Sequence, residues 1–181
     1  MATQALVDQI NAATKGYILY RQLAFVAHTI WESGGYQYKE ELAAIQEPYT
    51  NKYAYQDCDA NANGTQLPPN GKPFYGRGYI QLSWCYNYKA YGAGRKVNGD
   101  PDYFYKNPEL VATTYAMDAA AWFFESSVTD ESKQFGVTTK AINGLECAPG
   151  YTGNTPQKRY TIFDALAKKT GLTGYSSAGC P

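Results

Sequence analysis

The chain has 181 residues, and its 16 basic and 16 acidic side chains cancel. A neutral balance offers no electrostatic attraction for nucleic acid or an anionic membrane, so neither is an expected partner. No apolar run approaches the roughly 18 residues that a spanning helix needs. We therefore expect one globular domain covering residues 1–181, large enough to bury well over half of its unfolded surface.

Helical periodicity opens the chain and predicts helices over 3–14 and 20–32. In the second helix, one apolar stripe is formed by Leu23, Val26, Ala27 and Ile30. Gly34 follows the last turn and suits a left-handed helix end. A short helix is predicted over 40–46, and the weak strand signals allow only a small sheet or hairpin in 36–56.

Two acidic residues near the end of the second helix could form an acid–base pair. Glu32 lies on the face opposite the apolar stripe, together with Phe25, His28 and Thr29. Partial desolvation and the negative end of the helix dipole would both raise the pKa of such a carboxyl, as a general acid requires. Glu41 lies nine residues later, past a Gly-Gly corner, and could face it across a groove with room for a water. His28, the single histidine, either orients Glu32 or is a structural hydrogen-bonding residue.

The segment 49–74 is polar, rich in proline and irregular, and it precedes the glycine-kinked stretch YGRGYIQLSWCYNY at 75–88. We expect 49–74 to be a loop that either has a function or is closed by a disulfide. A helix over 81–91 is predicted for the glycine-kinked stretch, with Gly76 and Gly78 turning the chain before it and Arg77 serving only the connection. Amides, hydroxyls and tyrosines on its exposed edge would suit hydrogen bonding to sugars. The chain also has 18 tyrosines against 7 phenylalanines. This bias fits either a partly solvent-exposed aromatic surface that binds carbohydrate, or tyrosines at the partly exposed edge of the hydrophobic core.

Later helices are predicted over 108–124, with Pro108 in its first turn, and over 133–142 and 156–170, which makes the fold mainly α. Four cysteines without a CxxC spacing argue against zinc and favour two disulfides, with three pairings open. They are Cys58, Cys85, Cys147 and Cys180. Disulfides indicate an oxidising compartment, although the first 16 residues lack the pattern of a secretory signal. The sequon at Asn63 is consistent with secretion.

Taken together, four segments resemble a family 19 glycoside hydrolase: LAFVAHTIWESGG at 23–35, YGRGYIQLSWCYNYKAYG at 75–92, NPELV at 107–111 and AINGLEC at 141–147. The resemblance covers about residues 20–180, in the family's order, and is greatest to its compact bacterial members. It implies a lysozyme-like, two-lobed, mainly helical fold with a small β element. It also implies an endo-acting, inverting chitinase that needs no cofactor or metal and acts on chitin or chitooligosaccharides.

The resemblance also assigns roles to individual residues. Glu32 matches the general acid, Glu41 the general base (with Glu40 as the alternative if the register slips by one), and Ser83 the serine that holds the attacking water. Residues that match contacts to N-acetylglucosamine are Gln81, Tyr86, Asn87 and Asn143. Glu146 and Arg159 match a buried charged pair that supports the acid, and Cys147–Cys180 matches a C-terminal disulfide, which leaves Cys85 as the expected partner of Cys58.

Two positions depart from the family pattern. Trp31 stands immediately before the acid, where the family usually has histidine, and Tyr79 replaces a proline or small residue. The first change could alter activity or its pH optimum, and the second the packing of the loop or the groove entrance. The implied protein is an extracellular monomer with no appended carbohydrate-binding module in 1–181. Alternatives are a peptidoglycan hydrolase and a chitin-binding protein without activity, although the presence of both carboxylates argues against the latter.

Overall fold

A computed structural model describes residues 3–46, 73–129 and 132–180. By its contacts the chain divides into two compact units. Unit 1 comprises Met1–Trp31 and Phe124–Pro181, and unit 2 comprises Glu32–Phe123. Helices dominate both units, as the sequence predicts, and none of those in the described segments combines the length and apolarity needed to cross a membrane.

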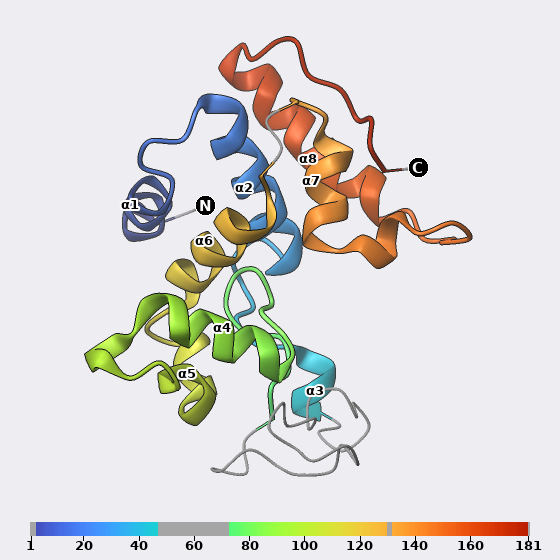
Figure 1. Ribbon diagram of the computed structural model, residues 1–181. Helices are drawn as coiled ribbons and strands as arrows, with labels where there is room; N and C mark the ends of the chain where they lie inside the picture. Colours follow the sequence, from blue (N-terminus) through green and yellow to red (C-terminus); the bar gives the residue numbers. More distant parts are fainter. Residues whose placement is uncertain (1–2, 47–72, 130–131, 181) are drawn as a thin grey trace. The chain divides into compact units, whose positions relative to one another are not determined.

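Unit 1 is built from helices of the two chain ends (Figure 1). They are α1 Gln4–Ala13, α2 Leu19–Glu32, α7 Phe135–Ile142, the 3₁₀ turn η4 Gly144–Cys147, and α8 Thr155–Thr170. The Thr3 hydroxyl accepts a hydrogen bond from the Leu6 N–H and caps α1, while Gly171, at a φ of 72°, ends α8 in the left-handed conformation. The predicted ranges of these helices are therefore confirmed to within two residues.

The core of unit 1 surrounds α2 on more sides than its apolar stripe predicts. Phe25, His28 and Thr29, on the face opposite the stripe, are fully buried, whereas Val26 and Ile30 of the stripe are half-buried. Aromatic rings make this packing: Phe124 meets Phe25 edge to face with ring centroids 5.5 Å apart. A helix that is buried on nearly all sides is a core helix. The face that carries Glu32 is thus protein-covered rather than solvated.

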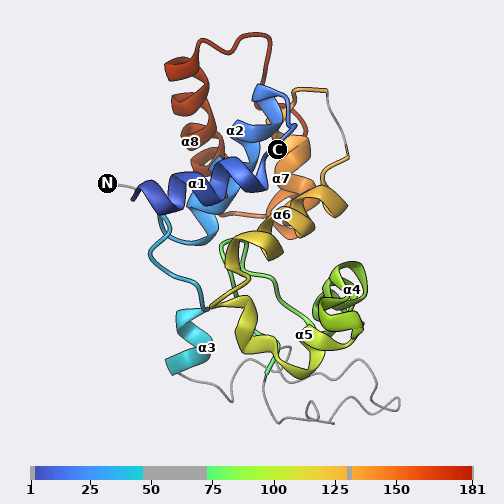
Figure 2. The same cartoon turned by 90° about the vertical axis from the view of Figure 1, so that its left-hand side faces the viewer.

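Unit 2 contains the helices α3 Leu42–Gln46, α4 Cys85–Arg95 and α5 Tyr103–Lys106, with 3₁₀ turns η2 Val97–Gly99 and η3 Pro108–Val111. Helices α4 and α5 pack against each other (Figure 2). Gly92 permits this approach, because a Cβ there would overlap the Pro101 carbonyl oxygen. Next to it, the Tyr91 and Phe104 rings stack with centroids 4.1 Å apart.

Two of the predicted helices have different bounds. The one predicted over 108–124 is split into η3, which begins at Pro108, and α6 Ala116–Ser127, which runs from unit 2 into unit 1. The one predicted over 81–91 begins only at Cys85, because Gln81 and Trp84 have positive φ angles of 54° and 73° and a helix cannot pass through them. Helix α5 was not predicted, since its four residues carry too little periodicity.

The small β element consists, in the described segments, of isolated bridges. In unit 2 Arg77 pairs antiparallel with both Glu40 and Leu82, so the pairing partner of the predicted 36–56 region is the glycine-kinked stretch. Residues 47–56 of that prediction, like most of the loop 49–74, lie outside the described residues.

Arg77 holds this part of unit 2 together. Its side chain is buried and donates to the Pro73 carbonyl at 2.7 Å and to the Tyr88 hydroxyl at 3.2 Å. The guanidinium also lies over the Tyr75 ring, 3.7 Å from its centroid. The role of Arg77 is structural, in agreement with the sequence interpretation.

Candidate functional site

Glu32 is the last residue of α2 and is half-buried. The helix stops there because Gly34, Gly35 and Tyr36 follow with φ angles of 57°, 77° and 66°. The Ser33 side chain accepts a hydrogen bond from the Tyr36 N–H at 2.8 Å and so fixes the exit of the chain. The predicted glycine-terminated helix end is confirmed, and it places a carboxylate where the helix dipole is negative.

Glu41 is anchored to the glycine-kinked stretch of unit 2. Its N–H donates to the Gly76 carbonyl at 2.8 Å, and its Oε2 accepts from the Gly76 N–H at 3.1 Å. A carboxylate held by a backbone donor keeps a defined orientation. Such a group suits a general base that must accept a proton from water.

Gln81 and Ser83 lie over the same glycine. A Cβ built on Gly76 would lie 2.8 Å from the Gln81 Oε1 and 3.3 Å from the Ser83 Oγ. The turn is rigid, because Gln81 donates to the Gly78 carbonyl at 3.0 Å and Ser83 donates to the Gln81 carbonyl at 2.9 Å. Glu41, Gln81 and Ser83 therefore converge around Gly76, on a turn and not on the helix that the sequence predicted for the latter two.

Glu40, the alternative base, is engaged elsewhere. Its Oε1 accepts from the Tyr75 hydroxyl at 2.8 Å and lies 3.5 Å from the Arg77 Nε in an ion pair. The Arg77 Nε makes no hydrogen bond in that geometry. A carboxylate that neutralises a buried guanidinium has a structural task, so the geometry favours Glu41 over Glu40 as the base.

An aromatic surface follows at the start of α4. Tyr86 is 58% exposed and Trp84 is 37% exposed, and their rings stack with centroids 6.0 Å apart. The Asn87 amide donates to the Ser83 carbonyl at 2.8 Å, which links α4 to the turn. Sequence reasoning selected Tyr86 and Asn87 but missed Trp84. The available signal was the indole itself, an aromatic ring with a polar N–H in a stretch rich in amides and hydroxyls.

Tyr79 packs inward, away from this exposed surface. It is buried and meets Tyr36 edge to face, with centroids 5.1 Å apart and the Lys39 ammonium 5.4 Å from its own ring. Its N–H donates to the Ala116 carbonyl at 3.2 Å. The departure from proline or a small residue thus adds packing between the Gly-Gly corner and the glycine-kinked stretch.

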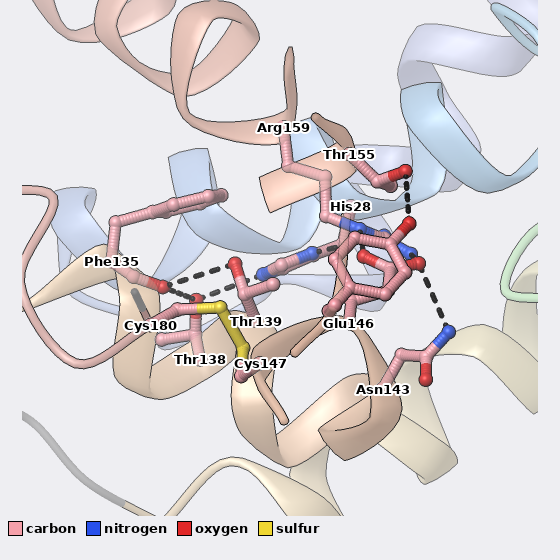
Figure 3. The surroundings of a disulfide bond; sticks show 11 residues. His28, Phe135, Thr138, Thr139, Asn143, Glu146, Cys147, Thr155, Arg159 and Cys180 are labelled. Carbon is pink, nitrogen blue, oxygen red and sulfur yellow. Dashed lines mark hydrogen bonds and ion pairs between the residues drawn. A yellow bond between two sulfur atoms is a disulfide. The ribbon is translucent and has the colours of Figure 1, made fainter. Parts of the chain in front are cut away.

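The predicted charged pair of unit 1 is present (Figure 3). Arg159 donates from Nε to the Glu146 Oε2 at 2.8 Å and from a terminal nitrogen to the Glu146 Oε1 at 2.9 Å. Arg159 is 1% exposed and Glu146 is 9% exposed. This bidentate geometry is the strong, oriented form of such an ion pair. The Asn143 amide donates to the same Glu146 Oε1 at 2.9 Å, so one carboxylate orients both side chains.

His28 continues this network and does not carry charge. Its Nδ1 lies 3.4 Å from a terminal nitrogen of Arg159, and its Nε2 lies 2.8 Å from the Thr138 hydroxyl (Figure 3). The Thr138 hydroxyl donates to the Phe135 carbonyl at 2.8 Å, so it accepts from an Nε2–H, and Nδ1 accepts from Arg159. Burial, followed by the nearby Arg159 charge, lowers the pKa of His28 well below 6.5. His28 is therefore a structural hydrogen-bonding residue, as one of its two predicted roles requires.

The disulfide Cys147–Cys180 ties the chain end to η4, and Cys85 is also disulfide-bonded. The expected partner of Cys85, Cys58, lies outside the described residues. Within the described ranges, no group of three or more His, Cys, Asp or Glu side chains is arranged to hold a metal ion.

The structure thus forms two local sets of the predicted residues. Unit 2 unites Glu41, Gln81 and Ser83 around Gly76, with Tyr86 and Asn87 on the adjoining helix. Unit 1 unites Asn143, Glu146 and Arg159, with His28 added by the structure. Glu32 is the first residue of unit 2, directly after the first segment of unit 1.

Comparisons with known proteins found a matching family and several relatives. Residues 11–134 match the family described as chitinase class I, glycoside hydrolase family 19. An endochitinase of Arabidopsis thaliana is 36% identical over 173 residues, covering 93% of this chain and 55% of that protein. A basic endochitinase of Brassica napus is 38% identical over 130 residues, covering 70% of this chain and 43% of that protein. The chain thus spans about half the length of these relatives.

Among solved structures, chitinase C of Streptomyces griseus superposes with a TM-score of 0.73 at 25% identity, covering 98% of this chain and 73% of that one. A class IV chitinase of Zea mays superposes with a TM-score of 0.71 at 26% identity, covering 99% and 87%. The predicted lysozyme-like helical fold is thereby confirmed. With its motifs, its fold and its relatives in agreement, the chain belongs to glycoside hydrolase family 19.

Proposed function

We propose that the protein is an endo-acting chitinase that hydrolyses β-1,4 linkages between N-acetylglucosamine units with inversion of the anomeric carbon. The observation that carries this proposal is the convergence of Glu41, Gln81 and Ser83 around Gly76. A carboxylate anchored to Gly76 and a hydroxyl on the turn beside it can hold a water between them, and the carboxylate can remove its proton. The names of the relatives, endochitinases of two plants, point to the same substrate.

In this mechanism Glu32 is the acid that protonates the glycosidic oxygen. Glu41 accepts the proton of the water as it attacks the anomeric carbon from the opposite face of the sugar, and the Ser83 hydroxyl orients that water. The carboxyl groups of inverting glycosidases are about 6.5–9.5 Å apart, which leaves space for the water. Gln81, Tyr86, Asn87 and Asn143 are assigned to hold acetamido groups and hydroxyls, and Trp84 adds an aromatic face to this surface.

The charged network of unit 1 serves the acid indirectly. Arg159 is held by Glu146 on two oxygens and by His28, so its positive charge stays in a fixed place. A fixed cation near the end of α2 would offset the cost of a second carboxylate there and orient Glu32. This role makes Arg159 and Glu146 positioning residues.

The protein is further proposed to be secreted and to act as a monomer. The Cys147–Cys180 disulfide and the disulfide-bonded Cys85 support an oxidising compartment. Size-exclusion chromatography with light scattering should give one species near 20.0 kDa, the mass of the chain. A species of twice that mass would contradict the monomer.

The test of function is proton NMR of freshly cleaved hexa-N-acetylchitohexaose. The α-anomer should appear first, and Glu32→Gln and Glu41→Gln should each lower the rate by about 10²–10⁴-fold, the usual contribution of a general acid or base. The matched control is Glu40→Gln, which keeps an acceptor for Tyr75 and should retain most of the activity.

Each other result overturns a different part of the proposal. First appearance of the β-anomer contradicts inversion. Loss of activity in Glu40→Gln but not in Glu41→Gln moves the base by one residue. An intact hexamer, together with cleared bacterial cell walls, replaces chitin by peptidoglycan as the substrate. Chitin binding without cleavage, unchanged in Glu32→Gln, makes the protein a binding protein.

A further inference from the structure

A cavity of about 250 Å³ lies entirely within unit 1. It is bounded by the first turn of α7, the segment that enters α8 and the C-terminal tail 176–180. Its lining contains none of the residues assigned to the acid, the base or the sugar contacts above. Phe135, Thr139 and Cys180, which belong to its wall, are labelled in Figure 3.

The C-terminal tail that forms one wall of this cavity is held in place without a ligand. The tail is held covalently by Cys147–Cys180, and its Ser176 carbonyl accepts from the Phe135 N–H at 2.8 Å. The tail also lies directly against Gly136, where a Cβ would overlap the backbone of 177–180. A site that needs no ordering on binding loses less affinity to conformational entropy.

The chemistry of the lining selects a neutral, hydroxyl-rich ligand. None of the lining residues is charged. The side chains of Asn154, Gln157, Tyr160 and Ser177 supply two amides and two hydroxyls, and none of the four makes a side-chain hydrogen bond to another described residue. Amide and hydroxyl groups of this kind bond to sugar hydroxyls and acetamido groups as both donors and acceptors.

An aromatic face accompanies these polar groups. The Tyr160 ring is half-buried and lies against Phe135, with centroids 6.0 Å apart and planes at 52°. Phe135 itself is 1% exposed, so Tyr160 presents the accessible ring. An aromatic ring beside convergent amides and hydroxyls offers the apolar and polar contacts that the two sides of a pyranose need.

The size restricts the ligand to one ring. Pockets that enclose drug-sized molecules measure about 300–1,000 Å³, so a cavity of about 250 Å³ takes a single monosaccharide unit rather than a length of chain. We propose that this cavity binds one N-acetylglucosamine-type unit of a chitin strand, separately from the residues that cleave it. The choice of an N-acetylated sugar rests on the proposed function, whereas the preference for a neutral sugar rests on the lining.

The test uses the full chain labelled with ¹⁵N and titrated with N-acetylglucosamine, with glucose as a parallel arm. We expect saturable shifts that share one dissociation constant at the Asn154 and Gln157 side-chain amides and at the tail 176–180. The double variant Asn154→Ala/Gln157→Ala should weaken this binding at least tenfold. The control Gln9→Ala/Asn11→Ala removes two exposed amides from α1 and should change nothing.

A second measurement separates the cavity from catalysis. The Asn154→Ala/Gln157→Ala variant should cleave soluble hexamer at the rate of the parent but adsorb less to colloidal chitin. Absence of shifts in the cavity, or unchanged affinity in that variant, overturns the proposal, and equal binding of glucose overturns the N-acetyl preference. Cavity shifts in a chain that cleaves no chitin would support the site while refuting the proposed function, so the two failures are distinguishable.

Discussion

Removing the negative charge of Glu146 should destabilise the protein more than any change at its surface ion pairs. Glu146→Gln preserves the shape of the side chain but removes the Glu146 carboxylate from the Arg159 guanidinium, which is 1% exposed. His28 is held neutral, and its Nδ1 at 3.4 Å is a poor substitute for two charge-assisted bonds at 2.8 and 2.9 Å. Breaking a buried ion pair by removing one partner costs about 3–5 kcal/mol.

This cost corresponds to a large shift in thermal unfolding. For a chain of this length, 1 kcal/mol lowers Tm by about 2–4 °C, so Glu146→Gln should lower Tm by about 6–20 °C. The assay is differential scanning calorimetry with the disulfides intact. The double variant Glu146→Gln/Arg159→Gln should recover part of the loss, because it removes the buried positive charge together with the carboxylate.

The matched control is an ion pair on α8, the helix that carries Arg159. Lys168 pairs with Asp164 at 2.6 Å, but it is 73% exposed, so Lys168→Gln should leave Tm nearly unchanged. If Glu146→Gln resembles Lys168→Gln, or if the double variant is less stable than Glu146→Gln, the penalty does not come from the buried Arg159 charge and the reasoning fails.

Three further predictions concern pH, sterics and the disulfide. Because the pKa of folded His28 is well below 6.5, the unfolded chain binds one more proton than the folded chain below that pH. The free energy of unfolding should therefore fall as pH drops through 6.5, by up to about 1.4 kcal/mol per pH unit. Urea unfolding between pH 8 and 5 should show this slope, and an equal slope in His28→Gln would contradict it. Gly76→Ala should displace the Gln81 and Ser83 side chains and lower the rate of hexamer cleavage, while Tm changes little. The control Gly144→Ala, where a Cβ meets nothing within 4 Å, should keep both the cleavage rate and Tm of the parent. Full activity of Gly76→Ala would show that an added methyl group at this position does not crowd Gln81 and Ser83. The Cys147→Ala/Cys180→Ala variant opens a loop of 33 residues and should lose roughly 3–4 kcal/mol in guanidinium unfolding; a loss below 1 kcal/mol would show that the tail is held by its backbone contacts alone.

The sequence predicts the helical skeleton well because its signals are local. The periodic segments became α1, α2, α7 and α8, and the glycine after Glu32 ends its helix as expected. Pro108 does begin a helical turn, but that turn is 3₁₀ and four residues long. No proline or glycine marks the break between η3 and α6 in the sequence. The periodic pattern therefore predicted one continuous helix over both.

The prediction failed where the chain adopts conformations that its residue types disfavour. Gln81 and Trp84 have positive φ angles without being glycine or asparagine, so local propensity gave no reason to stop the helix there. That strained turn is what brings Gln81 and Ser83 to Gly76, and such strain is concentrated at functional sites. The partners of Glu40 were equally hidden, since Tyr75 and Arg77 lie more than 30 positions later and meet it only in the folded chain.

The departure at Trp31 acquires a physical meaning from the network beside it. The Trp31 ring lies 5.8 Å from the Arg159 guanidinium carbon and 5.9 Å from the Lys158 ammonium, so it covers positive charge where the family pattern has histidine. An indole does not titrate, and the single imidazole of the chain, His28, is kept neutral by burial and by Arg159, which lower its pKa. Arginine keeps its charge throughout the pH range in which proteins fold. Neither the residue before Glu32 nor the histidine of the network therefore changes its charge between mildly acidic and neutral pH, so in the proposed mechanism Trp31 stands beside the acid without adding a titratable group.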